Sequence, residues 1–269
     1  MKIPHLFAGA VVIAALCAAS PAQQAPIGFH TVNCVKIKPD KMSEYRKWGA
    51  EEFHKFAQGR VDSGAVSTYY RLRAVMPAGS SAECDYVTVW MYPGAPPAPL
   101  GTDELGAALK KAGLNMSGQE FMDRRDSMST LVSNSMFQNQ DSVGKAKKGD
   151  YMEVSYMKAS DVGAWIAFEE KVWKPLAEQM VKDGVQSGWS VNVQVMPFGT
   201  DVPYQGVTVD VYPSWDTVFK AQIDPAFNDR FKKVHPDMDQ EKTFANMQKV
   251  RSQSWTRLFV IEDMISAAK

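Results

Sequence analysis

Alternating hydrophobic and polar positions recur twice along the chain, in the same order. Residues 30–38 alternate in polarity as a β-strand does, and Pro39-Asp40 then supplies a turn and a helix-capping side chain. Apolar side chains recur at helical spacing from Met42 to Phe56. The same succession returns at residues 151–180. Each stretch therefore predicts a strand followed by an amphipathic helix.

A direct repeat underlies this recurrence. Residues 61–93 and 181–213 align without a gap at an offset of 120, and 12 of the 33 positions are identical. Both segments carry Val-Met-Pro-x-Gly, followed by Val-Thr-Val and Tyr-Pro. Self-similarity of this kind indicates an internal duplication, so the two copies are expected to have the same order of elements.

The remaining elements follow the repeat. Gly64 and Gly184 stand where the two helices are expected to end, because glycine favours the left-handed conformation there. Pro175 is expected to kink or restart the second copy's helix. Further strands are predicted at residues 67–76, 86–92, 187–196 and 206–212, helical segments at 103–111, 119–125, 215–221 and 240–251, and closing strands at 130–137 and 255–262. The predicted order is βαββαβ, twice.

The first residues are typical of a secretory signal. Lys2 precedes an apolar run from Leu6 to Ala19, and the small residues Ser20 and Ala22 suit cleavage after residue 22. The run is shorter than the ~20 residues that span a bilayer. We therefore expect residues 1–22 to be a signal peptide, with the mature protein periplasmic or extracellular and not stably inserted in a membrane.

A lipoprotein is the alternative at this end of the chain, since Cys17 follows the apolar stretch. Leu16 disfavours it, because a small residue is expected before a lipidated cysteine. Beyond the signal, residues 28–140 are expected to form the first repeat and residues 151–265 the second. Residues 141–150 are polar and rich in Gly and Lys, a composition that suits a linker.

The element order predicts an α+β fold. A βαββαβ chain forms a four-stranded sheet with both helices on one face, the ferredoxin-like arrangement. The other face stays uncovered, so two tandem units are expected to pack sheet to sheet. In this respect residues 28–265 resemble the dimeric α/β-barrel superfamily, and the repeated VMPxG and VTVxxYP segments resemble its second and third strands. The resemblance implies a pseudo-dimeric α/β barrel.

The same resemblance implies several chemistries and favours none. The superfamily includes cofactor-independent monooxygenases of antibiotic biosynthesis, and haem enzymes such as chlorite dismutases and dye-decolourising peroxidases. We predict no cofactor, although haem is not excluded. Sharing a fold gives little support to a shared function.

The two faces of the third strand in each copy differ in character. Val87, Val89 and Met91 make one face apolar, as do Val207, Val209 and Val211 in the second copy, and we expect this face to pack on the helices. The other face is expected to meet the opposite sheet around a ligand space. Its candidate residues are Thr88, Trp90, Tyr92, Thr208, Asp210 and Tyr212. Simple packing of these side chains between two sheets is an equally weighted alternative.

Two arginines distinguish the copies in the second strand. Arg71 and Arg73 stand where the other copy has Val191 and Val193. On an enclosed face an arginine needs a carboxylate or an anionic ligand, because burying an unpaired charge is costly. Glu153 or Asp210 could supply the carboxylate, and Asn33 could help to orient a ligand. Arginines solvated at a sheet edge are the commoner explanation.

The histidines and cysteines give weaker indications. His54 and His235 are possible haem ligands, but an isolated histidine is usually a surface or packing residue. No histidine pair has metal-binding spacing, so no metal site is predicted. Cys34 and Cys84 could form a disulfide in an oxidising compartment. Whether their Cα atoms lie within the ~7 Å that a bridge requires stays open.

Composition and missing motifs narrow the function. The chain has 30 basic and 30 acidic residues and no basic stripe, which excludes a nucleic-acid-binding surface. It has no G-x-S-x-G elbow, P-loop or G-x-G-x-x-G. We expect an exported protein that binds a small molecule, with a cofactor-independent monooxygenase-like enzyme and a structural or cell-surface module as alternatives. The oligomeric state is not indicated.

Overall fold

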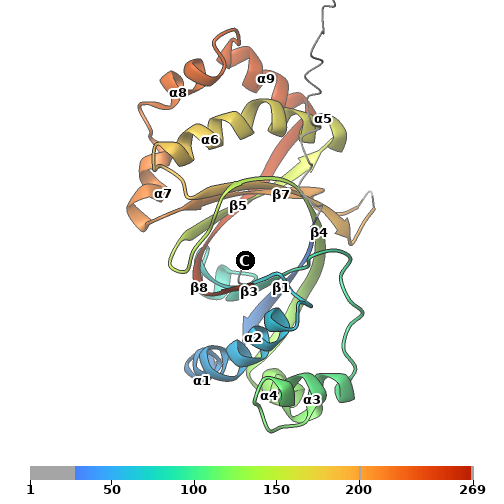
Figure 1. Ribbon diagram of the computed structural model, residues 1–269. Helices are drawn as coiled ribbons and strands as arrows, with labels where there is room; N and C mark the ends of the chain where they lie inside the picture. Colours follow the sequence, from blue (N-terminus) through green and yellow to red (C-terminus); the bar gives the residue numbers. More distant parts are fainter. Residues whose placement is uncertain (1–27, 200, 268–269) are drawn as a thin grey trace, which may run out of the picture.

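A closed barrel of eight antiparallel strands forms the centre of the computed structural model, which describes residues 28–199 and 201–267 (Figure 1). The predicted signal peptide and Cys17 lie outside these residues. Around the barrel the strands follow the order β1-β3-β2-β8-β5-β7-β6-β4. Their bounds are β1 Phe29–Ile37, β2 Thr68–Met76, β3 Tyr86–Met91, β4 Ser129–Gly144, β5 Tyr151–Ala159, β6 Gly188–Met196, β7 Gly206–Tyr212 and β8 Arg251–Ser266.

Helices cover the outside of the barrel in two groups, one from each half of the chain. Figure 1 looks down the barrel, with the first group below it and the second above. The first group comprises α1 (Met42–Trp48), α2 (His54–Asp62), α3 (Thr102–Lys111) and α4 (Gly118–Met128). The second comprises α5 (Val162–Phe168), α6 (Lys174–Lys182), α7 (Trp215–Gln222), α8 (Phe227–Val234) and α9 (Gln240–Val250). The α+β class is confirmed, and α8 is an addition to the predicted elements.

Each half keeps its own four strands adjacent, in the orders β4-β1-β3-β2 and β8-β5-β7-β6. Hydrogen-bonded pairing of β2 with β8 and of β6 with β4 joins the halves. The two halves thus form the barrel that the resemblance implied, and they meet through hydrogen-bonded strand edges as well as across its interior. The physical reason is the length of β4 and β8, 16 residues each, which lets them pair along both sides.

The predicted linker is shorter than expected. β4 continues through Gly144, and its last residues pair with β6, for example Asn139 with Asn192. The connection to β5 therefore spans only residues 145–150. Strand pairing joins backbone groups, so the polar composition of residues 138–144 did not prevent it.

Each half also has the same break in its first helix. A five-residue π-helical segment separates α1 from α2 (Gly49–Phe53) and α5 from α6 (Glu169–Trp173). Pro175 lies in the first turn of α6, where a restart was predicted. The first half breaks without a proline. There Gly49 faces Arg71, and a Cβ at this glycine would lie 1.7 Å from Arg71 Nη1.

Large aromatic side chains fill the space between the helices and the barrel. Trp48 packs between Phe53 and Phe121, with ring centroids 4.9 and 5.3 Å away, and Trp165 is fully buried in the second half. On the inside of the barrel most side chains are smaller and many are valines. This difference leaves the helix layers filled and the barrel hollow.

Candidate binding site inside the barrel

The barrel encloses a cavity of about 970 Å³. Small-molecule sites commonly have volumes of roughly 300–1,000 Å³ and mainly hydrophobic walls. Valines from both halves supply much of the wall here: Val32, Val87, Val89, Val154, Val207, Val209 and Val211. β-branched residues favour strands, and their short side chains do not reach across an eight-stranded barrel. The cavity is therefore a consequence of the short side chains that these strands point into the barrel.

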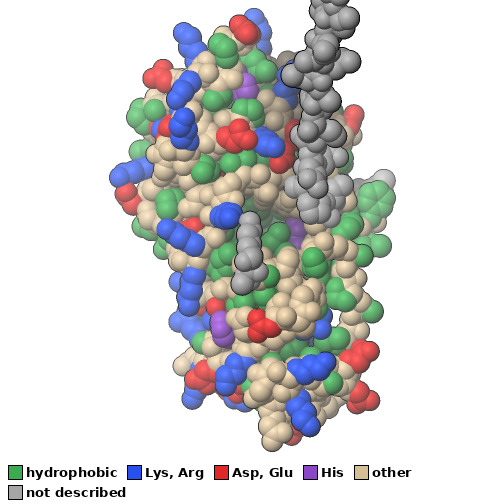
Figure 2. Space-filling model, viewed as in Figure 1, with side chains coloured by type: hydrophobic (Ala, Val, Ile, Leu, Met, Phe, Trp, Pro, Cys, Tyr) green, Lys and Arg blue, Asp and Glu red, His purple; other side chains and the backbone are tan. Residues whose placement is uncertain are grey.

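The wall reaches the protein surface at both ends. Exposed Glu83 and Ser133 belong to the lining at one end, and exposed Ser142, Lys145 and Ser266 belong to it at the other. In the face seen in Figure 2, hydrophobic side chains gather around the middle of the molecule, between the two groups of helices. A small molecule could therefore enter from solvent.

An aromatic cluster narrows the end of the cavity near Glu83. The Tyr156 ring lies 4.7 Å from that of Tyr204 and 5.0 Å from that of Trp255. The guanidinium of Arg257 lies over Tyr156 and Trp255, at 5.3 and 5.7 Å from their ring centroids. Burial raises the pKa of the Tyr156 phenol to about 12, so it stays protonated at neutral pH.

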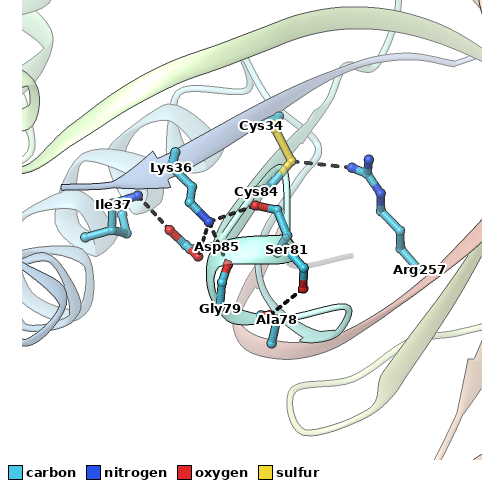
Figure 3. A network of polar contacts seen from close by, with 10 residues as sticks. Cys34, Lys36, Ile37, Ala78, Gly79, Ser81, Cys84, Asp85 and Arg257 are labelled. Atoms are coloured by element: carbon cyan, nitrogen blue, oxygen red, sulfur yellow. Dashed lines mark hydrogen bonds and ion pairs between the residues drawn. A yellow bond between two sulfur atoms is a disulfide. The ribbon is translucent and has the colours of Figure 1, made fainter. Parts of the chain in front are cut away.

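A disulfide forms part of the same wall. The structure joins Cys34 on β1 to Cys84 just before β3, with the Cα atoms 5.3 Å apart, inside the limit that the sequence left open (Figure 3). Arg257 Nη1 lies 3.6 Å from Cys84 Sγ, and Nη2 is paired with Glu83. In the described part of the chain, the one group of metal-ligand types found close together is Cys34, Glu83 and Cys84. Its two sulfur atoms are bonded to each other rather than free as thiolates.

Lys36 and Asp85 hold the loop that carries Cys84. The Lys36 ammonium donates hydrogen bonds to the carbonyls of Gly79 and Ala82 at 2.9 and 2.7 Å, and it contacts Asp85 at 3.1 Å (Figure 3). The other carboxylate oxygen of Asp85 accepts a hydrogen bond from the Ile37 amide at 2.8 Å. The loop is thus attached to β1 by polar contacts as well as by the disulfide.

His30 is the histidine that lines the cavity in the described residues. Its ring stacks on Phe137, with centroids 5.5 Å apart. Burial lowers the pKa of His30 to about 4, so the imidazole is neutral at pH 7. Nothing in the sequence pattern singled it out.

The two predicted haem ligands do not line the cavity. His54 Nδ1 is 2.8 Å from Asp263 Oδ2, and His235 Nε2 is 2.8 Å from the carbonyl oxygen of Val172. His235 packs against Phe231 in the helix layer. Because neither histidine belongs to the cavity wall, neither is placed to bind a haem inside the barrel.

The assignment of the two strand faces is reversed. The alternation itself is as predicted, but the apolar triplets at 87, 89, 91 and 207, 209, 211 point into the barrel. None of the ten candidate residues belongs to the cavity wall: Asn33, Arg71, Arg73, Thr88, Trp90, Tyr92, Glu153, Thr208, Asp210 and Tyr212. The reason is that the helices bring large rings of their own, and Trp90 packs against Phe53 and Phe56 of the helix layer.

In the first half the predicted residues bind one another or the helix layer. Asn33 Nδ2 donates to Thr88 Oγ1 at 3.2 Å, and Tyr92 Oη lies 3.0 Å from Thr31 Oγ1. Arg73 Nε donates to Glu262 Oε1 at 2.5 Å, and Arg71 Nη2 lies 3.8 Å from Glu262 Oε2.

Arg71 is not a solvated edge arginine, since only 5% of it is exposed. Its carboxylate partner is Glu262, which the sequence did not identify; neither Glu153 nor Asp210 takes that role. The structure therefore brings the two arginines together at Glu262 on the outer face of β2, with Arg71 buried against Gly49 and Arg73 half-buried.

In the second half the candidate carboxylates have amide partners. Asp210 Oδ1 accepts a hydrogen bond from Gln186 Nε2 at 2.8 Å, and Glu153 Oε2 accepts one from Gln222 Nε2 at 2.9 Å. Glu153 and Asp210 are cross-strand neighbours in β5 and β7. Burial, and then the charge of Glu153, raise the pKa of Asp210 to about 7. Thr208 is buried, and Tyr212 packs with Val218 and Leu258.

No model of a known protein family and no curated protein matches this chain. Several solved structures are similar in fold, among them the following three. A provisionally named monooxygenase of Fusobacterium nucleatum has a TM-score of 0.56 at 9% identity, covering 90% of this chain and 95% of its own. A second provisionally named monooxygenase, from Lactobacillus acidophilus, has a TM-score of 0.52 at 10% identity, covering 89% of this chain and 96% of its own. An anthrone oxidase-like protein has a TM-score of 0.52 at 13% identity, covering 91% of this chain and 95% of its own. At such identities the likeness shows the fold, which agrees with the resemblance to dimeric α/β-barrel proteins.

Proposed function

We propose that this protein is exported and binds a small, largely apolar molecule inside its barrel. The observation that carries the proposal is the cavity of about 970 Å³ with valine-rich walls from both halves. Export rests on the signal-like residues 1–22. No helix within the described ranges is both long and apolar enough to cross a bilayer. The structural-module alternative requires a filled interior and is less well supported.

Placing a large side chain in the cavity should weaken binding. Val209 lies on β7 and belongs to the cavity wall, so Val209→Trp places an indole in the ligand space. We expect the affinity for the fluorescent dye 1-anilinonaphthalene-8-sulfonate to fall by about tenfold or more, which corresponds to roughly 1.4 kcal/mol. Fluorescence titration measures this, with circular dichroism to verify folding.

The matched control is Val132→Trp. Val132 lies on β4, is 44% exposed and does not belong to the cavity wall, so this variant should bind the dye as the wild type does. Equal dye binding by the wild type and Val209→Trp would show that the dye does not enter the barrel, and the proposal would then be wrong.

A monooxygenase-like enzyme is the second candidate, favoured by the names of the structural neighbours. In that case the substrate itself, an electron-rich phenol, would react with oxygen inside the cavity. Neutral His30 lies in the wall, and its imidazole could accept a hydrogen bond from the phenolic hydroxyl and so orient the substrate. Oxygen uptake in the presence of an anthrone, compared between the wild type and His30→Phe, tests this role.

We also infer that the two halves are tandem ferredoxin-like units. The inference is supported by the offset of 120 between the repeated segments and by the identical strand order in each half. The break by a π-helical segment at the same place in both first helices agrees with it.

A further inference from the structure

The two places where the halves of the barrel join have opposite chemistry, although they are equivalent in the fold. At one junction β2 pairs with β8, and Leu72 lies opposite Ile261. At the other β6 pairs with β4, and Asn192 lies opposite Asn139. The offset of 120 relates Leu72 to Asn192. Ile261 and Asn139 correspond to each other as the cross-strand partners of these two equivalent residues.

The difference extends along the second strand of each half. The inward side chains of β2 are Tyr70, Leu72 and Ala74, whereas the equivalent positions in β6 hold Ser190, Asn192 and Gln194. Around the barrel the two junctions lie on opposite sides. The cavity therefore has an apolar wall at the β2–β8 junction, where Leu72 and Phe259 line it and cluster with buried Ile261, and a polar stripe facing it.

In the polar stripe Asn192 and Gln194 are buried, Asn139 and Ser190 are half-buried, and hydrogen bonds join several of the side chains. Asn139 Nδ2 donates to Asn192 Oδ1 at 2.9 Å, and Asn192 Nδ2 donates to Ser190 Oγ at 3.0 Å. Gln194 Nε2 donates to the carbonyl oxygen of Pro197 at 2.9 Å. The buried Oε1 of Gln194, a residue only 5% exposed, has no hydrogen-bond partner.

Packing alone does not account for this stripe. Burying amide groups in an apolar interior is unfavourable unless they are hydrogen-bonded, and an unpaired acceptor carries its full desolvation cost. The same fold position is filled by a leucine–isoleucine pair at the other junction, so the backbone does not require polar side chains here. Retaining asparagine, serine and glutamine is useful if a ligand meets them.

We propose that the ligand is facially amphipathic: a rigid apolar body with hydroxyl groups along one face. The hydroxyl face would contact Asn139, Asn192 and Gln194, and the apolar face would lie against the β2–β8 wall. This inference rests on the proposed function, because it assumes that the cavity binds a ligand at all.

Bile acids supply a matched series of probes, because lithocholate, deoxycholate and cholate share one steroid body and carry one, two and three hydroxyls. Binding governed by hydrophobicity alone would follow the order lithocholate, deoxycholate, cholate. We expect the reverse order, with cholate bound about tenfold more tightly than lithocholate. Isothermal titration calorimetry at monomeric concentrations measures all three.

The test variant takes its residues from the other junction. Asn139→Ile with Asn192→Leu rebuilds the pair that Ile261 and Leu72 already form, so the barrel should fold. In this variant the order should revert to lithocholate first. Asn134→Leu, on the exposed outer face of β4, is the control and should keep the wild-type order.

Each outcome decides the question. If the wild type prefers lithocholate, or if the double variant keeps the preference for cholate, the polar stripe does not select the ligand and the inference is wrong. The same holds if no bile acid binds while 1-anilinonaphthalene-8-sulfonate still does, and the proposed function then stands. If neither bile acids nor the dye bind the wild type, the proposed function itself fails.

Discussion

Replacing Asp210 by asparagine is expected to stabilise the protein by about 4 kcal/mol near pH 8, and to leave its stability almost unchanged near pH 4. Asp210 is only 8% exposed, and its nearest titratable neighbour on the sheet is Glu153, with Glu169 contributing from the helix layer. Burial and these two acids raise its pKa from 3.8 to about 7.

The direction in which stability changes with pH depends on whether the folded or the unfolded state binds the Asp210 proton more tightly. Below the unfolded pKa both states are protonated, and the contribution of Asp210 is fully present. Between about pH 4 and pH 7 the unfolded chain loses its proton while the folded protein keeps it, so stability falls as pH rises. Asparagine keeps an amide oxygen for Gln186 and does not ionise. The stability of the Asp210→Asn variant should therefore not decrease in this way as pH rises.

Urea denaturation of both proteins across this pH range measures the difference. Asp237→Asn, at an exposed site, is the control and should change stability by less than about 0.5 kcal/mol. A difference between Asp210→Asn and the wild type that does not grow with pH would contradict the assignment of a buried, proton-holding carboxyl.

Removing the Cys34–Cys84 crosslink should lower the free energy of unfolding by about 4 kcal/mol. The bridge spans a sequence separation of 50, and closing a loop of this length restricts the unfolded chain by about that amount. In the folded protein the loop remains attached through Lys36 and Asp85, so the Cys34→Ala, Cys84→Ala variant should keep its structure. The loss therefore arises mainly in the unfolded state.

Equilibrium unfolding in urea measures this loss, and wild-type protein under reducing conditions should show the same decrease as the double variant. Agreement between the two separates loss of the crosslink from loss of side-chain packing. A decrease of less than about 1 kcal/mol in both would mean that the crosslink does little to restrict the unfolded chain.

The order of the elements was accessible from the sequence because each strand and helix has its own periodicity. The lengths of β4 and β8 could not be predicted from the sequence. Their outer parts pair with the opposite half of the chain, and residues 138–144 lack the apolar alternation of a half-buried strand. Helix α8 did have a signal, since Phe227, Phe231 and Val234 follow helical spacing and pack on α6.

The candidate site was harder to predict, because alternation separates two faces without saying which one lies inside. One face of this barrel wall packs on the helices, and the other lines the cavity. Trp90 looked like a ligand contact, but it fits among the rings of Phe53 and Phe56. The repeat did hold the missing signal: Leu72 aligns with Asn192, and Ala74 with Gln194.

Closure of the barrel within one chain frees its two halves to change separately. In a barrel assembled from two identical chains, any substitution that lines the shared cavity appears twice, at symmetric positions. Here Asn192 and Leu72 are encoded independently, so one wall could become polar while the other stayed apolar. A single polypeptide can therefore have a cavity with two chemically different walls, which hold a bound molecule in a single orientation. A symmetric pair of identical chains cannot do this.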